Sequence, residues 1–197
     1  WTNTGPTDKS MQLLIDRFAG TWNNRLELFV AGDAFVIDDD RVPSGSIVGH
    51  SAAPSIISVG AIDQANPGLA EIEPYSSRGQ SIIVFPSNAS RSTPTISAVD
   101  GIAVSGAGGF ESRFYGTSAA APHVAAVCAL MLSKNYNATV AQISAALKSS
   151  AEPRLYPYSF GSGVVNALAA VNALAMPAPG PEIAVQHLSG ANLSNSS

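Results

Sequence analysis

The 197-residue chain has little cysteine, little charge and no long apolar run. Its single cysteine, Cys128, excludes an internal disulfide framework. Charged residues make up 12% of the chain, the formal net charge is −4, and no Lys/Arg cluster occurs, which argues against nucleic acid and anionic lipid as partners. No run of about 18 apolar residues is present, so we expect no membrane span.

The residues that are abundant are small or apolar, and they fall into runs typical of buried strands and helices. Hydrophobic residues make up 46% of the chain, enough for a substantial core. Continuous apolar runs predict buried strands at 55–62, 81–85 and 95–99, and a further strand at 26–31. Apolar spacing predicts helices at 8–19, 117–135, 140–150 and 164–175. This alternation predicts an α/β fold: a doubly wound, mostly parallel sheet with helices on both faces.

The composition changes sharply near residue 176, which suggests the domain organisation. Residues 1–175 are expected to form one domain, and residues 176–181 a Pro-rich, semi-rigid linker. Residues 182–197 are rich in Ser and Asn, and either begin a further domain or form a tail.

The helix predicted at 117–135 is apolar nearly all round, which predicts burial on every side. Gly116, Thr117 and Ser118 open it, so the Ser118 hydroxyl is expected among free backbone N–H groups at the positive end of the helix dipole. Pro122 is expected in the first turn, where a missing N–H costs no hydrogen bond. The ordinary alternative is that Ser118 only caps the helix.

The pattern Gly-Thr-Ser-x-Ala-x-Pro-His-Val-Ala beginning at Gly116 resembles the nucleophile segment of the subtilisin-like serine proteases, the subtilases. Four other stretches also resemble the family and occur along the chain in the family's order, at 29–33, 57–63, 75–79 and 160–167. The resemblance covers residues 1–175 and implies the C-terminal part of a subtilase catalytic domain, with the N-terminal part missing. It further implies a serine endopeptidase that hydrolyses peptides or proteins, with Ser118 as nucleophile, and it implies secretion.

A serine nucleophile needs a general base and a group that orients it. In the family these are a histidine and an aspartate in upstream motifs, and neither His-Gly-Thr nor Asp-[Ser/Thr]-Gly occurs in this chain. His123 lies on the same helix as Ser118 and is expected to be structural, while His50 and His187 fall in a loop and in the tail. The chain alone is therefore expected to be inactive. The alternative is a non-catalytic subtilase-like module used for binding or architecture.

The resemblance places Asp33 at the oxyanion position, where the family usually has asparagine. An ionised carboxylate has no proton to donate and would repel the oxyanion. Three interpretations stay open here: a weakened or re-tuned oxyanion hole, a degenerate relative that is not catalytic, or a local slip in the correspondence.

The resemblance also implies where substrate side chains bind. Ala31 and Gly32 are expected along the wall of the pocket for the residue before the scissile bond, and Gly49 near its floor, although Gly49 fits a simple turn equally well. No cofactor and no metal centre are expected. The acidic run Asp38–Asp40 could give oxygen ligands to calcium, but such a run is more often a solvated loop. The oligomeric state is left open.

Overall fold

The computed structural model describes residues 4–7, 9, 15, 19–21, 28, 42–84, 86–109 and 111–177. Contacts divide the chain into two units, residues 1–37 and 38–197. All the described helices and strands belong to the second unit. The helix expected at 8–19 and the strand expected at 26–31 lie largely outside the described residues, and the tail 182–197 lies wholly outside them. The division into a domain, a linker and a tail stays a prediction.

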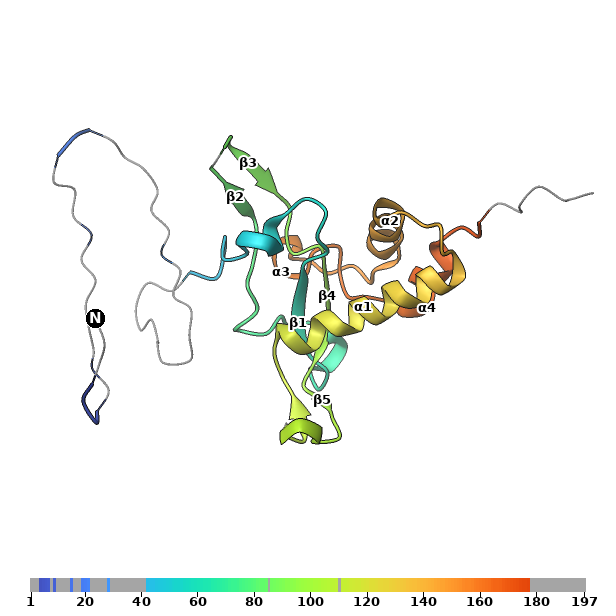
Figure 1. Cartoon of the computed structure of the whole chain (residues 1–197), viewed down its shortest axis with the longest axis horizontal. Helices are drawn as coiled ribbons and strands as arrows, with labels where there is room; N and C mark the ends of the chain where they lie inside the picture. Colours follow the sequence, from blue (N-terminus) through green and yellow to red (C-terminus); the bar gives the residue numbers. More distant parts are fainter. Residues whose placement is uncertain are drawn as a thin grey trace, which may run out of the picture. The chain divides into compact units, whose positions relative to one another are not determined.

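Two parallel strands form the centre of the second unit (Figure 1). Strand β1 (Val59–Asp63) pairs with β4 (Ile96–Asp100) in a register that sets Asp63 opposite Asp100. An isolated parallel bridge between Ser97 and Val164 extends this pairing on the far side of β4. The strand expected at 95–99 is therefore confirmed, whereas that expected at 55–62 begins only at Val59.

Helices and helical turns cover both faces of the parallel pair, as expected for a doubly wound α/β fold. Helix α1 (Thr117–Lys134) packs across β1 and β4, and α4 (Ala167–Ala173) packs against both α1 and α2 (Val140–Ser150). On the other face, Phe160 of α3 (Pro157–Phe160) packs with Ile62 of β1. Successive residues of β1 thus enter different clusters, Ala61 on the α1 side and Ile62 on the α3 side.

Two short antiparallel pairs complete the strands. Strand β2 (Ser81–Ile83) pairs with β3 (Ala89–Arg91), and β5 (Ile102–Ala103) pairs with β6 (Arg113–Phe114). The strand expected at 81–85 is confirmed over Ser81–Ile83, but its predicted burial is wrong, because Ile82 is 44% and Val84 74% exposed. Short 3-10 turns lie at Gly49–Ala52 (η1), Pro67–Leu69 (η2) and Ala107–Gly109 (η3).

Hydrogen bonds cap the start of α2 and join the end of α1 to α4. Thr139 caps α2 through a capping box with Gln142, in which the Thr139 backbone N–H donates to Gln142 Oε1 at 2.8 Å. At the end of α1, Lys134 Nζ donates to the Val171 carbonyl oxygen of α4 at 2.8 Å. Helix α4 begins after Asn166, three residues later than expected, because Val164 bridges to Ser97 and Glu152.

Helix α1 is buried on one side only, so the prediction of burial on every side is wrong for the described part of the chain. Its inner side packs on β1 and β4, and its buried residues are Ala119, Ala120, Val124, Val127 and Met131. Its outer side is equally apolar, yet Leu130 is 56% and Leu132 40% exposed. Apolar spacing shows which side chains a helix can bury, and it does not show whether a neighbour covers them.

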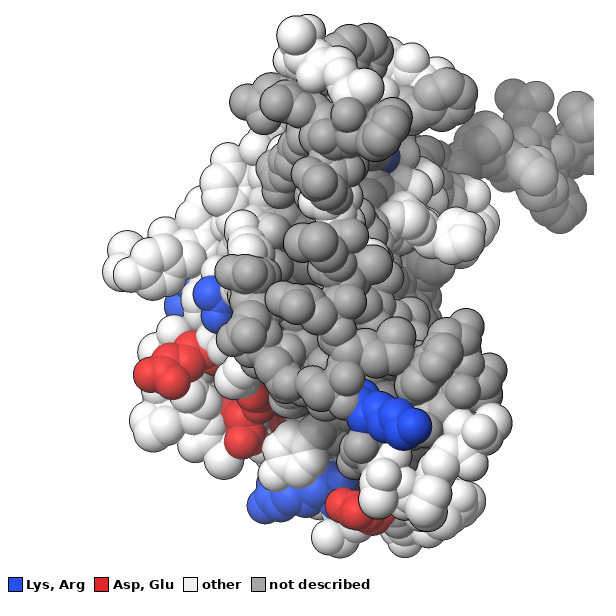
Figure 2. All heavy atoms as spheres, turned by 90° about the vertical axis from the view of Figure 1, so that its left-hand side faces the viewer, with Lys and Arg blue, Asp and Glu red and all other residues white. Residues whose placement is uncertain are grey.

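The surface of the described residues agrees with the low charge of the sequence. On the face drawn in Figure 2, acidic and basic side chains of described residues are few and lie interspersed, without a single-sign patch. Within the described ranges, no helix combines the length and the apolar character that crossing a membrane requires.

Candidate active site

The chain enters α1 through Gly116, whose backbone conformation suits glycine. Gly116 is the N-cap, with φ +110° and ψ 161°, a region that side chains with a Cβ rarely adopt. Its carbonyl oxygen accepts hydrogen bonds from the N–H groups of Ala119 at 2.8 Å and Ala120 at 3.2 Å. The turn before the predicted nucleophile is therefore held by the first turn of the helix itself.

Ser118 is the second residue of α1, and its side chain is exposed. Since Gly116 is the N-cap, Ser118 is not the capping residue, and the cap makes no side-chain hydrogen bond. The Ser118 N–H lies at the second position of the helix, ahead of the Ala119 and Ala120 donors that bond to Gly116, and has no carbonyl four residues earlier in the helix to bond to. An exposed hydroxyl beside free N–H groups at a positive helix end is the arrangement that stabilises an oxyanion formed there.

Pro122 lies further into the helix than expected. Helix α1 begins at Thr117, so Pro122 is its sixth residue and belongs to the second turn. A proline there cannot donate to the carbonyl four residues earlier, which is that of Ser118. The prediction that Pro122 sits in the first turn is wrong. The Ser118 carbonyl is instead left without its helical donor.

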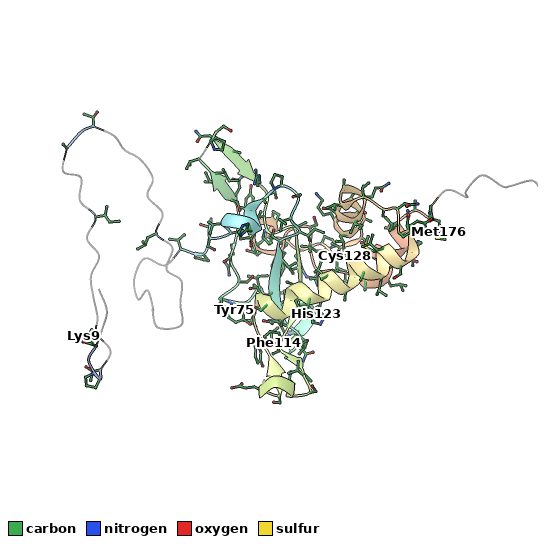
Figure 3. The ribbon with its side chains drawn as sticks, in the orientation of Figure 1. Lys9, Tyr75, Phe114, His123, Cys128 and Met176 are labelled. Atoms are coloured by element: carbon green, nitrogen blue, oxygen red, sulfur yellow. The ribbon has the colours of Figure 1, made fainter. Side chains whose placement is uncertain are left out.

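His123 is engaged with its own helix, which agrees with a structural role. Its Nδ1 lies 2.9 Å from the carbonyl oxygen of Ala119, four residues earlier. The half-buried ring borders an apolar hollow between α1 and the β5–β6 pair, whose side Phe114 also lines (Figure 3). His50 lies exposed in η1, and His187 is outside the described residues.

Cys128 lies in the middle of α1, half-buried against the core cluster. Burial raises the pKa of its thiol above the usual value, which disfavours the reactive thiolate. This setting fits the expected small buried apolar side chain.

Sequence reasoning missed an aspartate that contacts the nucleophile turn. Asp100 ends β4, and its side chain is completely buried. Its Oδ2 accepts a hydrogen bond from the Gly116 N–H at 2.7 Å and another from the Tyr75 hydroxyl. Its Oδ1 is buried and has no partner. Its place at the carboxyl end of a parallel strand, where sites in α/β folds gather, was a signal that could have pointed to it.

The surroundings of Asp100 shift the pKa values of its neighbours. Burial raises the pKa of Tyr75 above its ordinary value, and the hydrogen bond and charge of Asp100 raise it further, so Tyr75 stays a proton donor. Burial also raises the pKa of Glu73, and the nearby carboxylates of Asp100 and Asp63 raise that pKa further, while the Tyr75 side chain opposes the rise. Among the described residues, no group of three or more His, Cys, Asp or Glu side chains could hold a metal ion.

A hollow of about 180 Å³ lies beside Thr117, the residue before Ser118. Val48 borders it, together with Ser46, Ile47, Ser51, Ser58, Val59 and Ser77. Gly49 is exposed in η1 with φ +61°, and a Cβ there would meet no atom within 4 Å. A positive φ favours glycine, so the turn conformation alone explains a glycine at this position. Its role in substrate binding stays a prediction.

Ala31, Gly32, Asp33 and Asp38–Asp40 lie outside the described residues. The oxyanion position, the pocket wall and the calcium loop therefore stay predictions. The structure does bring the carboxyl ends of β1 and β4 together with the start of α1, through Asp100 and Gly116.

Comparisons with known proteins agree with this arrangement. The profile of the subtilase family matches residues 3–172. Over 128 residues, 64% of this chain, the sequence is 35% identical to a subtilisin of Bacillus pumilus, of which the match covers 41%. Over the same share it is 34% identical to subtilisin E of Bacillus subtilis (strain 168), of which the match covers 30%. The chain thus spans less than half the length of these curated relatives.

Among solved structures, the CspB protease of Clostridium perfringens aligns with a TM-score of 0.51 and 25% identity, over 66% of this chain and 29% of that one. The shared α/β fold, the ordered motifs and the family match over residues 3–172 agree with one another. The chain belongs to the subtilase family and corresponds to the C-terminal part of its catalytic domain.

Proposed function

We propose that the chain supplies the nucleophile-bearing part of a serine endopeptidase that cleaves peptides or proteins outside the cell. The observation behind the proposal is the exposed Ser118 in the first turn of α1, beyond a glycine cap that leaves its hydroxyl free of a capping role. The family match supports the same chemistry.

In the proposed reaction, Ser118 Oγ attacks the carbonyl carbon of the scissile peptide bond. A histidine from the upstream family motif takes the hydroxyl proton and then delivers it to the leaving amine, which gives an acyl-enzyme. Water, activated by the same histidine, hydrolyses the ester and regenerates Ser118. The Ser118 N–H, in the first turn of α1, would face the oxyanion. Ala31, Gly32 and the region of Gly49 would line the pocket for the residue before the scissile bond.

An organophosphonate probe tests the nucleophile, because it reacts only with an activated serine. The full-length gene product should be labelled on Ser118, and its Ser118→Ala variant should not, as peptide mapping by mass spectrometry will show. The 197-residue chain alone should react far more slowly, because a general base is absent from its motifs. Labelling of the isolated chain at the rate of the full-length protein would contradict the dependence on an upstream histidine.

Asp33 favours a second candidate, a non-catalytic module, because a carboxylate at the oxyanion position opposes acyl transfer. In subtilisin itself, mutagenesis puts the loss of the asparagine donor from the oxyanion hole at about 10²–10³ in turnover. Asp33→Asn in the full-length protein should therefore raise turnover if the hole is weakened. A full-length protein that neither takes the probe nor gains activity from Asp33→Asn would favour the binding module.

A further inference from the structure

The carboxyl end of β4 meets the nucleophile turn at one buried carboxylate. Asp100 accepts from the Gly116 N–H at 2.7 Å and from the Tyr75 hydroxyl with the same oxygen, Oδ2. Figure 3 labels Tyr75 near the start of α1. Gly116 is thereby fixed on both sides: its N–H by Asp100, and its carbonyl by the N–H groups of Ala119 and Ala120.

The partners of Asp100 are themselves anchored to the sheet. Tyr75 precedes Ser76, whose buried Oγ accepts a hydrogen bond from the Ala61 N–H of β1 at 3.0 Å. Gly101 follows Asp100 with φ +62°, and a Cβ there would lie 2.7 Å from Asp63 Oδ1, so this position next to Asp100 requires glycine. The carboxylate therefore joins the paired strands β1 and β4 to the start of α1.

The setting of Asp100 is also unfavourable for the stability of the fold. It is completely buried, and its Oδ1 has no hydrogen-bond partner. A buried carboxylate oxygen without a partner destabilises the folded state, so a residue of this kind needs a further reason to be present. The contact with Gly116, two residues before the nucleophile, supplies such a reason.

We infer that Asp100 is a positioning residue for Ser118, acting through the Gly116 N–H and oriented by Tyr75. This inference rests on the proposed function, in which Ser118 is acylated. By fixing Gly116, Asp100 sets the direction in which the chain enters α1, and with it the places of the Ser118 hydroxyl and N–H. A displacement of about 1 Å at a reacting group can cost about 10²-fold in rate, so a loosened turn should slow acylation.

Two substitutions separate positioning from simple stability. Asp100→Ala removes the acceptor, whereas Asp100→Asn keeps one carboxamide oxygen that can accept from both Gly116 and Tyr75. In the full-length protein treated with an organophosphonate probe, Asp100→Ala should lower kinact by about tenfold or more with KI little changed. Asp100→Asn should keep most of the original kinact. The kinact of Tyr75→Phe should lie between those of Asp100→Ala and Asp100→Asn, because this variant removes one of the two donors to Asp100.

Asp63→Ala is the matched control. Asp63 ends the neighbouring strand opposite Asp100, and its Oδ1 accepts from the Ala65 N–H within its own turn. This variant should lower the thermal midpoint without changing kinact. Equal kinact for Asp100→Ala and the unsubstituted protein, or an equal loss in Asp63→Ala, would overturn the inference.

Hydrogen exchange distinguishes failure of this inference from failure of the proposed function. The Gly116 amide should be protected in the unsubstituted protein and in Asp100→Asn, and should exchange at least tenfold faster in Asp100→Ala. If the unsubstituted protein is not labelled but these exchange rates hold, the peptidase proposal fails while the fixed turn stands. An unprotected Gly116 amide in the unsubstituted protein overturns the positioning role directly.

Discussion

The two faces of α1 have similar side chains and different surroundings. The inner face places Val124, Val127 and Met131 in the core cluster that β1, β4, α2 and α4 share, with Met131 completely buried. The outer face presents Leu130 and Leu132, and both are exposed. Hydrophobicity alone therefore does not distinguish the faces. The stability of this unit should therefore depend on the inner side of the helix only, which substitutions on α1 can test.

The largest effect is expected from Met131→Ala on the inner face. The variant leaves a cavity in a completely buried site, and such large-to-small changes cost about 2–5 kcal/mol. Urea unfolding of the 197-residue chain, followed by circular dichroism, measures the loss. Leu132→Ala, one residue further along the same helix, is the matched control and should cost clearly less. Equal losses at the two positions would show that the faces do not differ in burial.

A smaller effect is expected from adding volume rather than removing it. Ala120 is completely buried, whereas Ala125 is exposed on the same helix. Ala120→Leu forces extra methylene groups into a packed site and should cost about 1–3 kcal/mol. Ala125→Leu should stay within about 0.5 kcal/mol of the unsubstituted chain. Urea titration of the two variants gives their free energies of unfolding. A marked loss of stability in Ala125→Leu would contradict an exposed outer face.

The parts of the fold that depend on local pattern could be predicted from the sequence. The unbroken apolar run before Asp100 gave β4, and the apolar spacing after Val140 gave α2. The exposure of β2 could not be predicted, because a run such as 81–85 is apolar whether its partner is parallel and buried or antiparallel and exposed. The four-residue α3 is too short to show a helical period.

The candidate site, like the fold, could be predicted from the sequence only in part. Ser118 was found because its flanking pattern is long and specific. Asp100 was missed because its contacts come from Tyr75, 25 residues earlier, and Gly116, 16 residues later. No spacing rule connects such positions, and only the folded chain brings a buried carboxylate to the turn before a nucleophile. The roles of Asp33, Ala31 and Gly32 still rest on family resemblance.

The smallest effect is expected on the outer face, from Leu130→Gln. Leu130 is 56% exposed, so an amide of similar length can stay hydrated there, and the loss should be about 1 kcal/mol or less. Urea unfolding of the chain at two protein concentrations provides the measurement. A loss as large as that of Met131→Ala, or a midpoint that depends on concentration only in the unsubstituted chain, would mean that something covers this face in solution. The two faces of α1 would then differ in what covers them, the inner face being packed by this chain and the outer face by a partner. The apolar residues on every side of α1 would each be buried.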